Sequence, residues 1–195
     1  EETTLRMADA LTKSGLISID RFLEQHRANE EFQQIGYGCI ALVINYHEQE
    51  HALYDDDQSW YRMLHNKMYD VTNSFQEYVG LPIRFVTFNY DRTLEMYLFN
   101  ALSNSFPGEV QGLEHFQELI NQKIIHAHGS LGTLAELPFN SWYGKDPFDP
   151  MKTGPTLSIV GDEAADLGLA KEWITTATDI HFLGFGYDHV NLEKL

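Results

Sequence analysis

The second half of the chain alternates between short apolar runs and longer amphipathic runs. Four short runs are rich in β-favouring residues and predict strands at Ile83–Phe88, Lys123–His128, Thr156–Val160 and Asp179–Phe185. Between them, apolar residues at helical spacing predict helices at about 93–102, 113–121 and 164–178. Strands that alternate with helices are typical of a parallel sheet covered by helices, so the pattern predicts an α/β fold.

The first half of the chain has the periodicity of helices. Residues 31–50 predict a buried helix whose core side would hold Phe32, Ile35, Cys39, Leu42, Val43 and Tyr46. Residues 59–78 predict another helix, with a core stripe of Trp60, Leu64, Met68, Val71 and Phe75. Ser18 or Asp20 is a candidate N-cap for a helix that includes Arg21 to His26.

Polar residues follow three of the four predicted strands. The clusters are Asn89-Tyr90-Asp91, His128-Gly129-Ser130 and a glycine-rich stretch that runs from Gly184 to Asn191. The carboxyl ends of parallel strands meet at one edge of a sheet, where ligands of open α/β sheets bind. The pattern therefore predicts one shared site built from three strand ends.

Each cluster also has a simpler interpretation. Asn89 or Asp91 could cap the helix that follows, and one residue is enough for that role. His126 and His128 would face the same way on a strand, either as a hydrogen-bonded pair or as zinc ligands, although no third ligand follows at a firm spacing. His128 alone suits a general base, because the ordinary histidine pKa of about 6.5 lies near neutrality. Gly129 would let a substrate approach closely.

The glycine-rich third cluster suits a ligand that presses against backbone amides. Gly184 and Gly186 could hold a nucleotide phosphate or ribose, although Gly-x-Gly also marks ordinary turns. The sequence contains neither a Walker GxxxxGK[ST] motif nor a complete GxGxxG motif. A P-loop and an ordinary Rossmann fingerprint are therefore excluded for the given sequence.

Composition narrows the classes of function. The 29 acidic and 13 basic residues give a formal charge of −16, which argues against a broad nucleic-acid surface. No apolar run approaches the roughly 20 residues of a membrane span, and no secretion signal opens the chain, so a cytoplasmic protein is expected. The single cysteine, Cys39, excludes a four-cysteine zinc site and is expected to be a small buried hydrophobe.

Taken together, the three clusters resemble the motifs of the sirtuin-like family, in particular the zinc-free bacterial sirtuin-like domains. Thr87-Phe88-Asn89-Tyr90-Asp91 resembles the family motif Thr-Gln-Asn-Ile-Asp, with phenylalanine in place of glutamine. His128-Gly129 matches the family His-Gly, and Gly184-Phe185-Gly186 stands more loosely at the Gly-Thr-Ser position. The stretch Ser18 to Leu23 is similar to the SIDxFL sequence of the bacterial relatives.

The resemblance implies a single sirtuin-like domain over residues 1–195. It would consist of a helical insertion at 16–80 and a Rossmann-like part at 81–195, with a parallel sheet flanked by helices. The family's Gly-Ala-Gly-x-Ser phosphate loop does not occur in this sequence, so by resemblance it is expected before Glu1, and the chain is expected to be truncated at its N-terminus.

By the same resemblance, NAD is the expected substrate or ligand. Asn89 and His128 would be catalytic: Asn89 would contact the nicotinamide ribose and help to place the attacking water, and His128 would deprotonate a ribose hydroxyl. Asp91 would hold the carboxamide end of nicotinamide. The full set of residues expected to bind the cofactor is Thr87, Phe88, Asp91, Gly129, Gly184, Phe185, Gly186 and Asn191.

The absence of a four-cysteine module shifts the expected activity from protein deacylation to NAD hydrolysis, which is associated with zinc-free bacterial relatives in antiviral defence. No zinc, membrane or nucleic acid is expected, and a homo-oligomer or a fused effector or sensor domain stays open. Three alternatives remain: a non-enzymatic module that binds NAD or ADP-ribose, a protein deacylase, and a metallohydrolase. The metallohydrolase would use His126 and His128 with Asp91 or Asp162.

Overall fold

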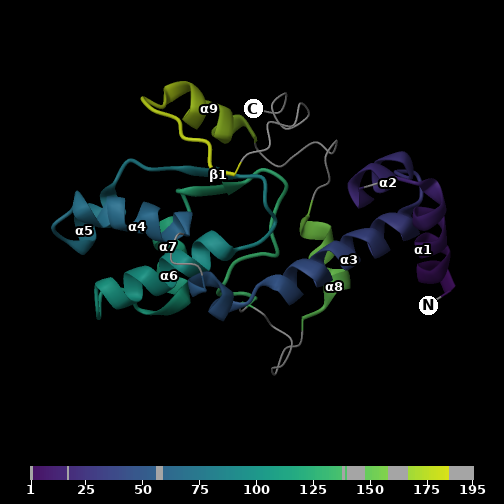
Figure 1. Ribbon diagram of the computed structural model, residues 1–195, viewed down its shortest axis with the longest axis horizontal. Coiled ribbons are helices and arrows are strands. Elements are labelled where there is room, and N and C mark those ends of the chain that lie inside the picture. The colour runs from purple at the N-terminus through teal and green to yellow at the C-terminus, as the bar shows by residue number, and fades with distance from the viewer. Residues whose placement is uncertain are drawn as a thin grey trace.

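Helices fill the chain up to the first strand. The computed structural model describes residues 2–16, 18–55, 59–137, 139, 148–157 and 167–184. The elements before the first strand are the helices α1 (Glu2–Ser14), α2 (Ile19–Gln25), α3 (Glu30–His47), α4 (Trp60–Asp70) and α5 (Phe75–Gly80), and the short 3-10 helix η1 (Glu50–Tyr54). In Figure 1, α1 to α3 lie to the right, and α4 and α5 lie to the left.

Two parallel strands form the sheet, and two helices connect them. Strand β1 (Phe85–Thr87) pairs with β2 (Ile124–His126) in the register Phe85↔Ile124, Val86↔Ile125 and Thr87↔His126. Between them, the chain forms α6 (Thr93–Ser105) and α7 (Gly112–Ile120). The predicted strand–helix–helix–strand order is confirmed, although both strands are shorter than the apolar runs that predicted them. The coarse α/β description agrees with this arrangement, in which helices predominate.

Of the two further predicted strands, Thr156–Val160 is described only at its first two residues, and Asp179–Phe185 is wrong for the residues that the structure describes. Thr156 ends the 3-10 helix η2 (Gly154–Thr156), and Leu157 makes one antiparallel bridge with Gly129. Residues 179–184 have no strand partner among the described residues, and Ile180, Phe182 and Leu183 are about half exposed. Residues 158–160 and Phe185 lie outside the described part of the chain. The described sheet therefore has two strands.

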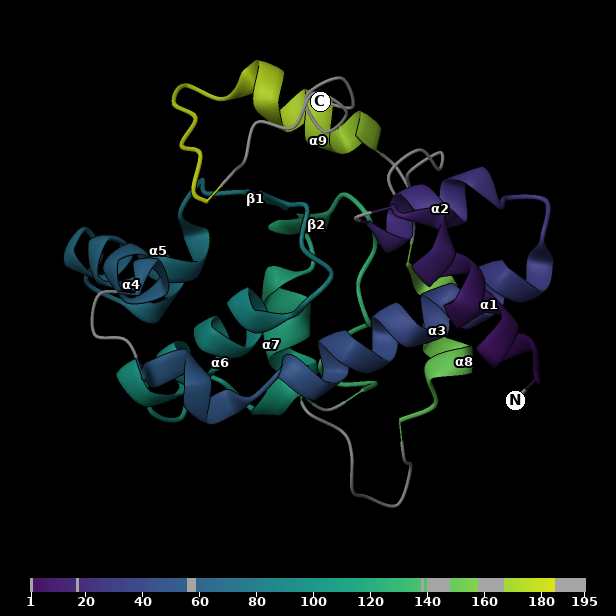
Figure 2. The ribbon, with the colours of Figure 1, turned by 45° about the vertical axis from the view of Figure 1, so that its right-hand side comes forward.

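Two helices lie near the end of the described chain. The short helix α8 (Pro150–Thr153) leads directly into η2, and both pack against α3. Helix α9 (Leu167–Thr176) confirms most of the helix predicted at 164–178. In both ribbon views it lies across the side of β1 opposite to α6 and α7 (Figures 1 and 2). Its Trp173 ring faces the Arg84 guanidinium at 5.6 Å.

Helix α3 is buried along a different side from the predicted one. Its buried residues are Phe32, Gly36, Gly38, Ala41 and Asn45, whereas Cys39, Val43 and Tyr46 are exposed. The glycines explain the difference, because they allow close approach of neighbouring elements. A methyl group on Gly36 would lie 2.5 Å from the Leu23 side chain, and one on Gly38 would lie 2.9 Å from the Met151 sulfur. The predicted burial of Cys39 is therefore wrong.

The single helix predicted at 59–78 is divided into α4 and α5. Ser74 accepts a hydrogen bond from the backbone N–H of Glu77 at 3.2 Å, and the Glu77 carboxylate accepts one from the N–H of Asn73 at 2.8 Å. The pair differs from a capping box only in that Asn73, and not the N-cap Ser74, is the backbone donor to Glu77, and it starts a new helix at Phe75. The break leaves Val71 largely exposed, while Met68 and Phe75 of the predicted stripe are buried.

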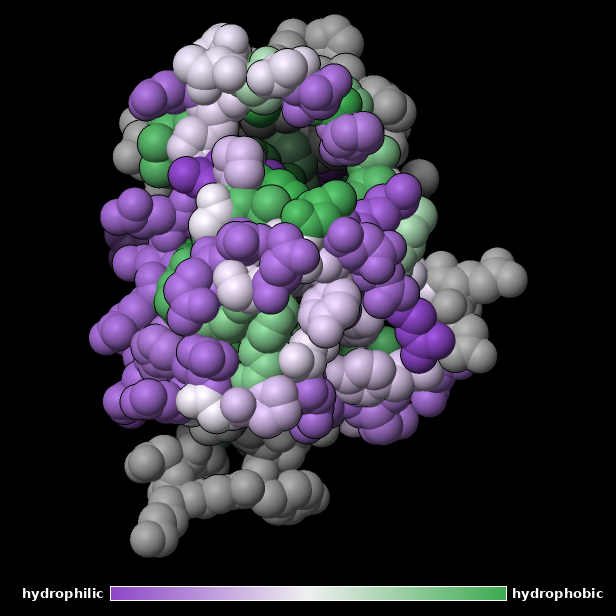
Figure 3. Space-filling model, turned by 90° about the vertical axis from the view of Figure 1, so that its left-hand side faces the viewer, coloured by the Kyte–Doolittle hydropathy of each residue, from purple (hydrophilic) through white to green (hydrophobic). Residues whose placement is uncertain are grey.

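The main hydrophobic core lies between the strand pair and helices α4 to α7. Phe116 and Leu102 are almost fully buried there, and Phe85 and Ile124 of the strands pack against the same cluster. A second core joins α1, α2 and α3 around Phe22. Figure 3, which looks at the left side of Figure 1, shows a mainly hydrophilic face with hydrophobic side chains around a hollow near the top. None of the described helices is long and apolar enough to cross a membrane.

His65 is a buried histidine within this core. Its Nδ1 lies 2.8 Å from the Tyr78 hydroxyl and its Nε2 lies 3.2 Å from the Ser105 hydroxyl, so both ring nitrogens have partners. Burial lowers the pKa of His65, which favours the neutral ring, and burial raises the pKa of Tyr78, which keeps its hydroxyl protonated. The site is therefore built for an uncharged imidazole.

We expect His65 to make the protein less stable in mild acid. Because its pKa is lower in the folded chain than in the unfolded chain, its contribution is present above the unfolded pKa of about 6.5 and is lost as the pH falls towards the folded pKa. His65→Gln should cost about 1–3 kcal/mol in free energy of unfolding at about pH 7.5 and less at about pH 5. Urea unfolding of both proteins across this range measures the difference, and a constant gap would contradict the assignment.

Candidate functional site

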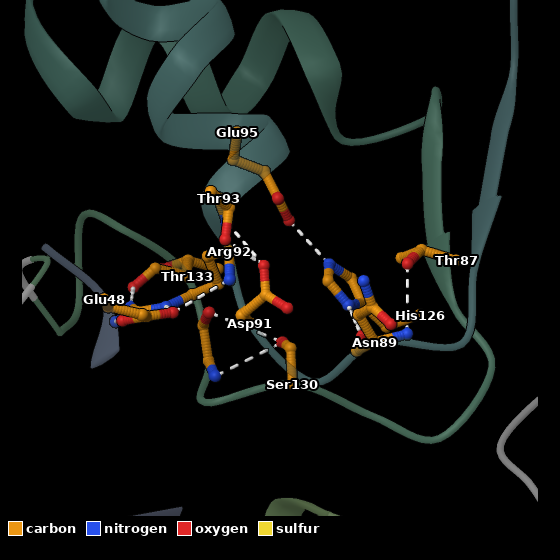
Figure 4. A network of polar contacts seen from close by, with 11 residues as sticks. Glu48, Thr87, Asn89, Asp91, Arg92, Thr93, Glu95, His126, Ser130 and Thr133 are labelled. Atoms are coloured by element: carbon orange, nitrogen blue, oxygen red, sulfur yellow. Dashed lines mark hydrogen bonds and ion pairs between the residues drawn. The ribbon is translucent and has the colours of Figure 1, made fainter. Parts of the chain in front are cut away.

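The strand register brings the first two polar clusters side by side. Thr87 and His126 are paired across β1 and β2, so Asn89 and His128 each follow two residues beyond the same rung of the ladder. Because the strands are parallel, both segments leave the same edge of the sheet. The loop that carries Asn89 passes beside the His126 ring, as Figure 4 shows. Two of the three predicted clusters therefore meet.

Asp91 has the capping role that the sequence left open between two residues. Its Oδ1 accepts a hydrogen bond from the backbone N–H of Thr93 at 3.2 Å, and the Thr93 hydroxyl donates to the same oxygen (Figure 4). These bonds occupy an otherwise unpaired donor in the first turn of α6. The second carboxylate oxygen of Asp91 takes no part in this cap.

Asn89 is held by its backbone, and its side chain is left exposed. The Asn89 N–H donates to the Thr87 hydroxyl at 3.1 Å, and its carbonyl oxygen lies 2.8 Å from Nδ1 of His126. The side-chain amide makes no hydrogen bond to any residue that the structure describes. Asn89 therefore presents a positioned amide at the strand end, while Asp91 starts the helix.

His128 is buried among aromatic rings next to Asn89. It is 3% exposed, and its ring centre lies 5.5 Å from that of Phe88 in an edge-to-face arrangement and 6.0 Å from that of Tyr90. Such a setting keeps water away from the imidazole. His128 therefore has a fixed position in a shielded environment, which suits a general base.

Asp20 of α2 interacts electrostatically with His128. Burial raises the pKa of Asp20, while the positive charge of His128 and a hydrogen bond with Ser18 act in the opposite direction. The sequence suggested Asp20 only as a helix cap, and in the structure Ser18 has that role because its hydroxyl accepts from the Asp20 N–H. Asp20 is thus a carboxylate near the candidate base that sequence reasoning missed.

The chain itself occupies the space above Gly129. Its φ is +76°, a conformation that favours glycine, and a methyl group there would lie 2.2 Å from the Thr156 carbonyl oxygen. The neighbouring bridge to Leu157 fixes this contact. The sequence predicted that a substrate would lie close to Gly129, but residues 156–157 occupy that position in the structure. Packing against these residues is therefore enough to explain why a glycine is needed here.

Arg92 is a structural residue of the strand–helix junction. It is 1% exposed, and its backbone N–H, Nε and a terminal nitrogen donate to the Glu48 carboxylate at 2.8, 3.1 and 2.5 Å. A second terminal nitrogen donates to the carbonyl oxygens of Thr133 and Leu137. The buried pair joins the end of α3 to the start of α6, and nothing in the local sequence identified Glu48 as its partner.

His126 forms a second ion pair beside the site. Its Nε2 lies 2.6 Å from Oε1 of Glu95, and both side chains are about nine-tenths buried (Figure 4). Burial lowers the pKa of His126, but the hydrogen bond and charge of Glu95 outweigh it, with smaller contributions from Asn89 and Asp91, so the net pKa is raised. The raised pKa, and the oxygen acceptors that both ring nitrogens face, favour the protonated form of His126.

The negative charges of Asp91 and Glu95 also affect the pKa of Tyr61 in α4. Burial, with smaller contributions from Asp91 and Glu95, raises the pKa of the Tyr61 hydroxyl to about 12, while a hydrogen bond with Thr93 acts in the opposite direction. The carboxylates of Asp91 and Glu95 thus form a negative region at the start of α6.

The metal interpretation has no geometric support in the described residues. Both nitrogens of His126 face other partners, and the described part of the chain holds no group of three histidine, cysteine, aspartate or glutamate side chains suited to a metal ion. Asp162, the alternative carboxylate ligand, lies outside the described residues. The metallohydrolase alternative stays a hypothesis without a ligand set.

The third polar cluster is described only at its first residue. Gly184 has a φ of +61° with open space around it, and it follows the exposed segment 179–183. Phe185, Gly186 and Asn191 lie outside the described residues, so their predicted role stays a prediction.

The chain was compared with protein-family models, with curated proteins and with solved structures, and none of the three comparisons found a match.

Proposed function

We propose that this chain is an NAD-binding domain of the sirtuin-like type, with a Rossmann-like arrangement, that hydrolyses NAD to nicotinamide and ADP-ribose. The observation that supports the proposal is the register of β1 and β2, in which Asn89 and His128 follow equivalent positions of adjacent parallel strands. An exposed amide and a buried imidazole at one sheet edge are the two groups that the motif resemblance makes catalytic.

The chemistry fits these two groups. Breaking the bond between nicotinamide and ribose leaves positive charge on the ribose carbon, and a water must attack that carbon to give ADP-ribose and a proton. The Asn89 amide would hold the water and the ribose hydroxyls, which lowers the entropic part of the barrier. His128 would accept a proton from a ribose hydroxyl, which stabilises the positive ring.

Two further features favour a ligand that needs shielding from bulk water. Phe88 and Tyr90 flank His128, and such rings suit the flat aromatic ring of nicotinamide. The Asp91 oxygen that the helix cap leaves unused is an acceptor for the N–H of a carboxamide. These contacts would orient the leaving group.

The proposal is tested by incubating the purified protein with NAD and separating the products by chromatography. We expect equal amounts of nicotinamide and ADP-ribose to form. Calorimetric binding of NAD or ADP-ribose without any turnover would instead assign a non-enzymatic binding module. Deacylation of an acyl-lysine peptide, or loss of activity on removal of a bound metal, would overturn the proposal in favour of the other two alternatives.

A further inference from the structure

A short segment built from α8 and η2 reaches the loop that follows β2. We call residues 149–157 the strap. The Thr156 hydroxyl donates a hydrogen bond to the Ser130 carbonyl oxygen at 2.7 Å, and Leu157 makes an antiparallel bridge with Gly129. The Thr156 carbonyl oxygen lies so close that a methyl group on Gly129 would be 2.2 Å away. The last two residues of the strap therefore fill the space beside Gly129.

The two ends of the strap are held in different ways. At the α8 end, a methyl group on Gly38 of α3 would lie 2.9 Å from the Met151 sulfur, and one on Gly154 would lie 2.8 Å from the Gly38 nitrogen. Packing as close as this leaves little room for movement. At the other end, Thr156 and Leu157 hold the loop after β2 through one hydroxyl and one bridge. This second end is therefore the part that can lift while α8 stays against α3.

The structure shows the strand-end site in a closed state. His128 is almost completely buried, whereas a base and the hydroxyl that it deprotonates must approach to about 2.6–3.2 Å. Leu157 is 4% exposed in a cluster with Ala41 and Leu131. Tyr90 packs against the same cluster, and its ring centre lies 6.0 Å from that of His128. The strap thus packs against one of the two rings that enclose the candidate base.

We propose that the strap closes the strand-end site in the free protein, and that its Thr156–Leu157 end must lift from Gly129 before a ligand reaches His128. The inference rests on the proposed function only in naming NAD as the ligand whose access is controlled. Burial of one leucine side chain favours the closed state by about 10–100-fold. The apparent affinity for a ligand of the open state falls by the same factor, so the strap is an autoinhibitory contact.

The experiment measures access to His128 without NAD. Diethyl pyrocarbonate transfers an ethoxycarbonyl group to a neutral, accessible imidazole nitrogen, and mass spectrometry of peptides gives the rate for each histidine. At about pH 7.5, where an ordinary histidine is neutral, we expect His128 to react about tenfold or more slowly than the exposed His47. Leu157→Ala should raise the His128 rate by about tenfold or more. Thr156→Val keeps the size of the side chain but removes its hydroxyl donor, and should raise the rate by about 2–10-fold.

Leu102→Ala is the matched control for loss of stability. Leu102 is a buried leucine of the main core, so its truncation destabilises the chain in the same way without touching the strap. The His128 rate should stay unchanged in this variant, and amide NMR spectra verify that each variant is folded. An equal rise in Leu102→Ala and Leu157→Ala, equal rates for His47 and His128 in the unaltered protein, or slow reaction of His128 in every variant would overturn the proposal.

NAD titrations of the same variants separate the strap from the proposed function. Leu157→Ala should bind NAD about tenfold or more tightly than the unaltered protein. If the His128 rates change as expected but no variant binds or hydrolyses NAD, the proposed function fails and the strap stands as the cover of His128. If NAD is hydrolysed with the same KM in all variants and the His128 rate does not change, the strap inference fails and the proposed function stands.

Discussion

Replacement of Arg92 or Glu48 by alanine is expected to lower the free energy of unfolding by about 3–5 kcal/mol. Both side chains are almost completely buried, and two side-chain nitrogens of Arg92, together with its backbone N–H, donate to the Glu48 carboxylate. Removal of either partner leaves an uncompensated charge in the interior, which costs far more than loss of the mutual attraction. A domain is stable by only about 5–15 kcal/mol in total, so the effect should be large in any unfolding curve.

The Arg92 variant should be affected through its backbone contacts as well. The guanidinium also donates to the carbonyl oxygens of Thr133 and Leu137, which would lose a buried donor. Glu48→Gln keeps the shape of the side chain and should cost less than Glu48→Ala. If Glu48→Ala does not fold, the smaller loss of stability in Glu48→Gln can still be measured and tests the same prediction.

The exposed ion pair of Lys13 and Asp9 provides the control. Its nitrogen and oxygen are 2.8 Å apart, as close as many buried pairs, but both side chains are in solvent. Asp9→Ala should therefore cost about 0–1 kcal/mol. Urea unfolding of the two single alanine variants and of the Arg92→Ala, Glu48→Ala double variant completes a cycle, in which the double variant should be more stable than the sum of the two single losses predicts. Additive losses would show that the two residues act separately.

Local signals predicted the elements around the site well. Short apolar runs located β1 and β2, and the amphipathic run after Asp91 located α6, because these features depend on residues within a few positions of one another. The S-x-x-E spacing of Ser74 and Glu77, which is typical of a helix start, was also readable from the sequence and would have predicted the break between α4 and α5.

Features that depend on distant partners could not be predicted in this way. The buried side of α3 follows from the fit of Gly36 and Gly38 against Leu23 and Met151, and apolar periodicity therefore indicated the wrong side. Glu48 and Arg92 are 44 positions apart, and no local pattern pairs them. Strand pairing is likewise non-local, so the apolar run at 179–185 predicted a strand, whereas its described residues 179–184 have no strand partner in the described structure.

The second large effect is expected at His128, given the proposed NAD hydrolysis. His128→Ala should reduce kcat by about 10²–10⁴-fold, the usual contribution of a positioned general base, and change KM much less. Because His128 is buried against Phe88 and Tyr90, His128→Gln serves as a better-packed variant with the same expected loss. Initial rates of nicotinamide release, measured across pH, test both variants.

Asn89 and His47 separate chemistry from stability in this experiment. The exposed Asn89 side chain makes no hydrogen bond to the described residues, so Asn89→Ala should remove turnover and leave the unfolding curve unchanged. His47, exposed near the end of α3, is the matched histidine control, and His47→Ala should keep full activity. If the His128 variants retained turnover while Asn89→Ala lost it, the base would have to be another group, and Asp20, which interacts with His128 from α2, would be the first residue to replace.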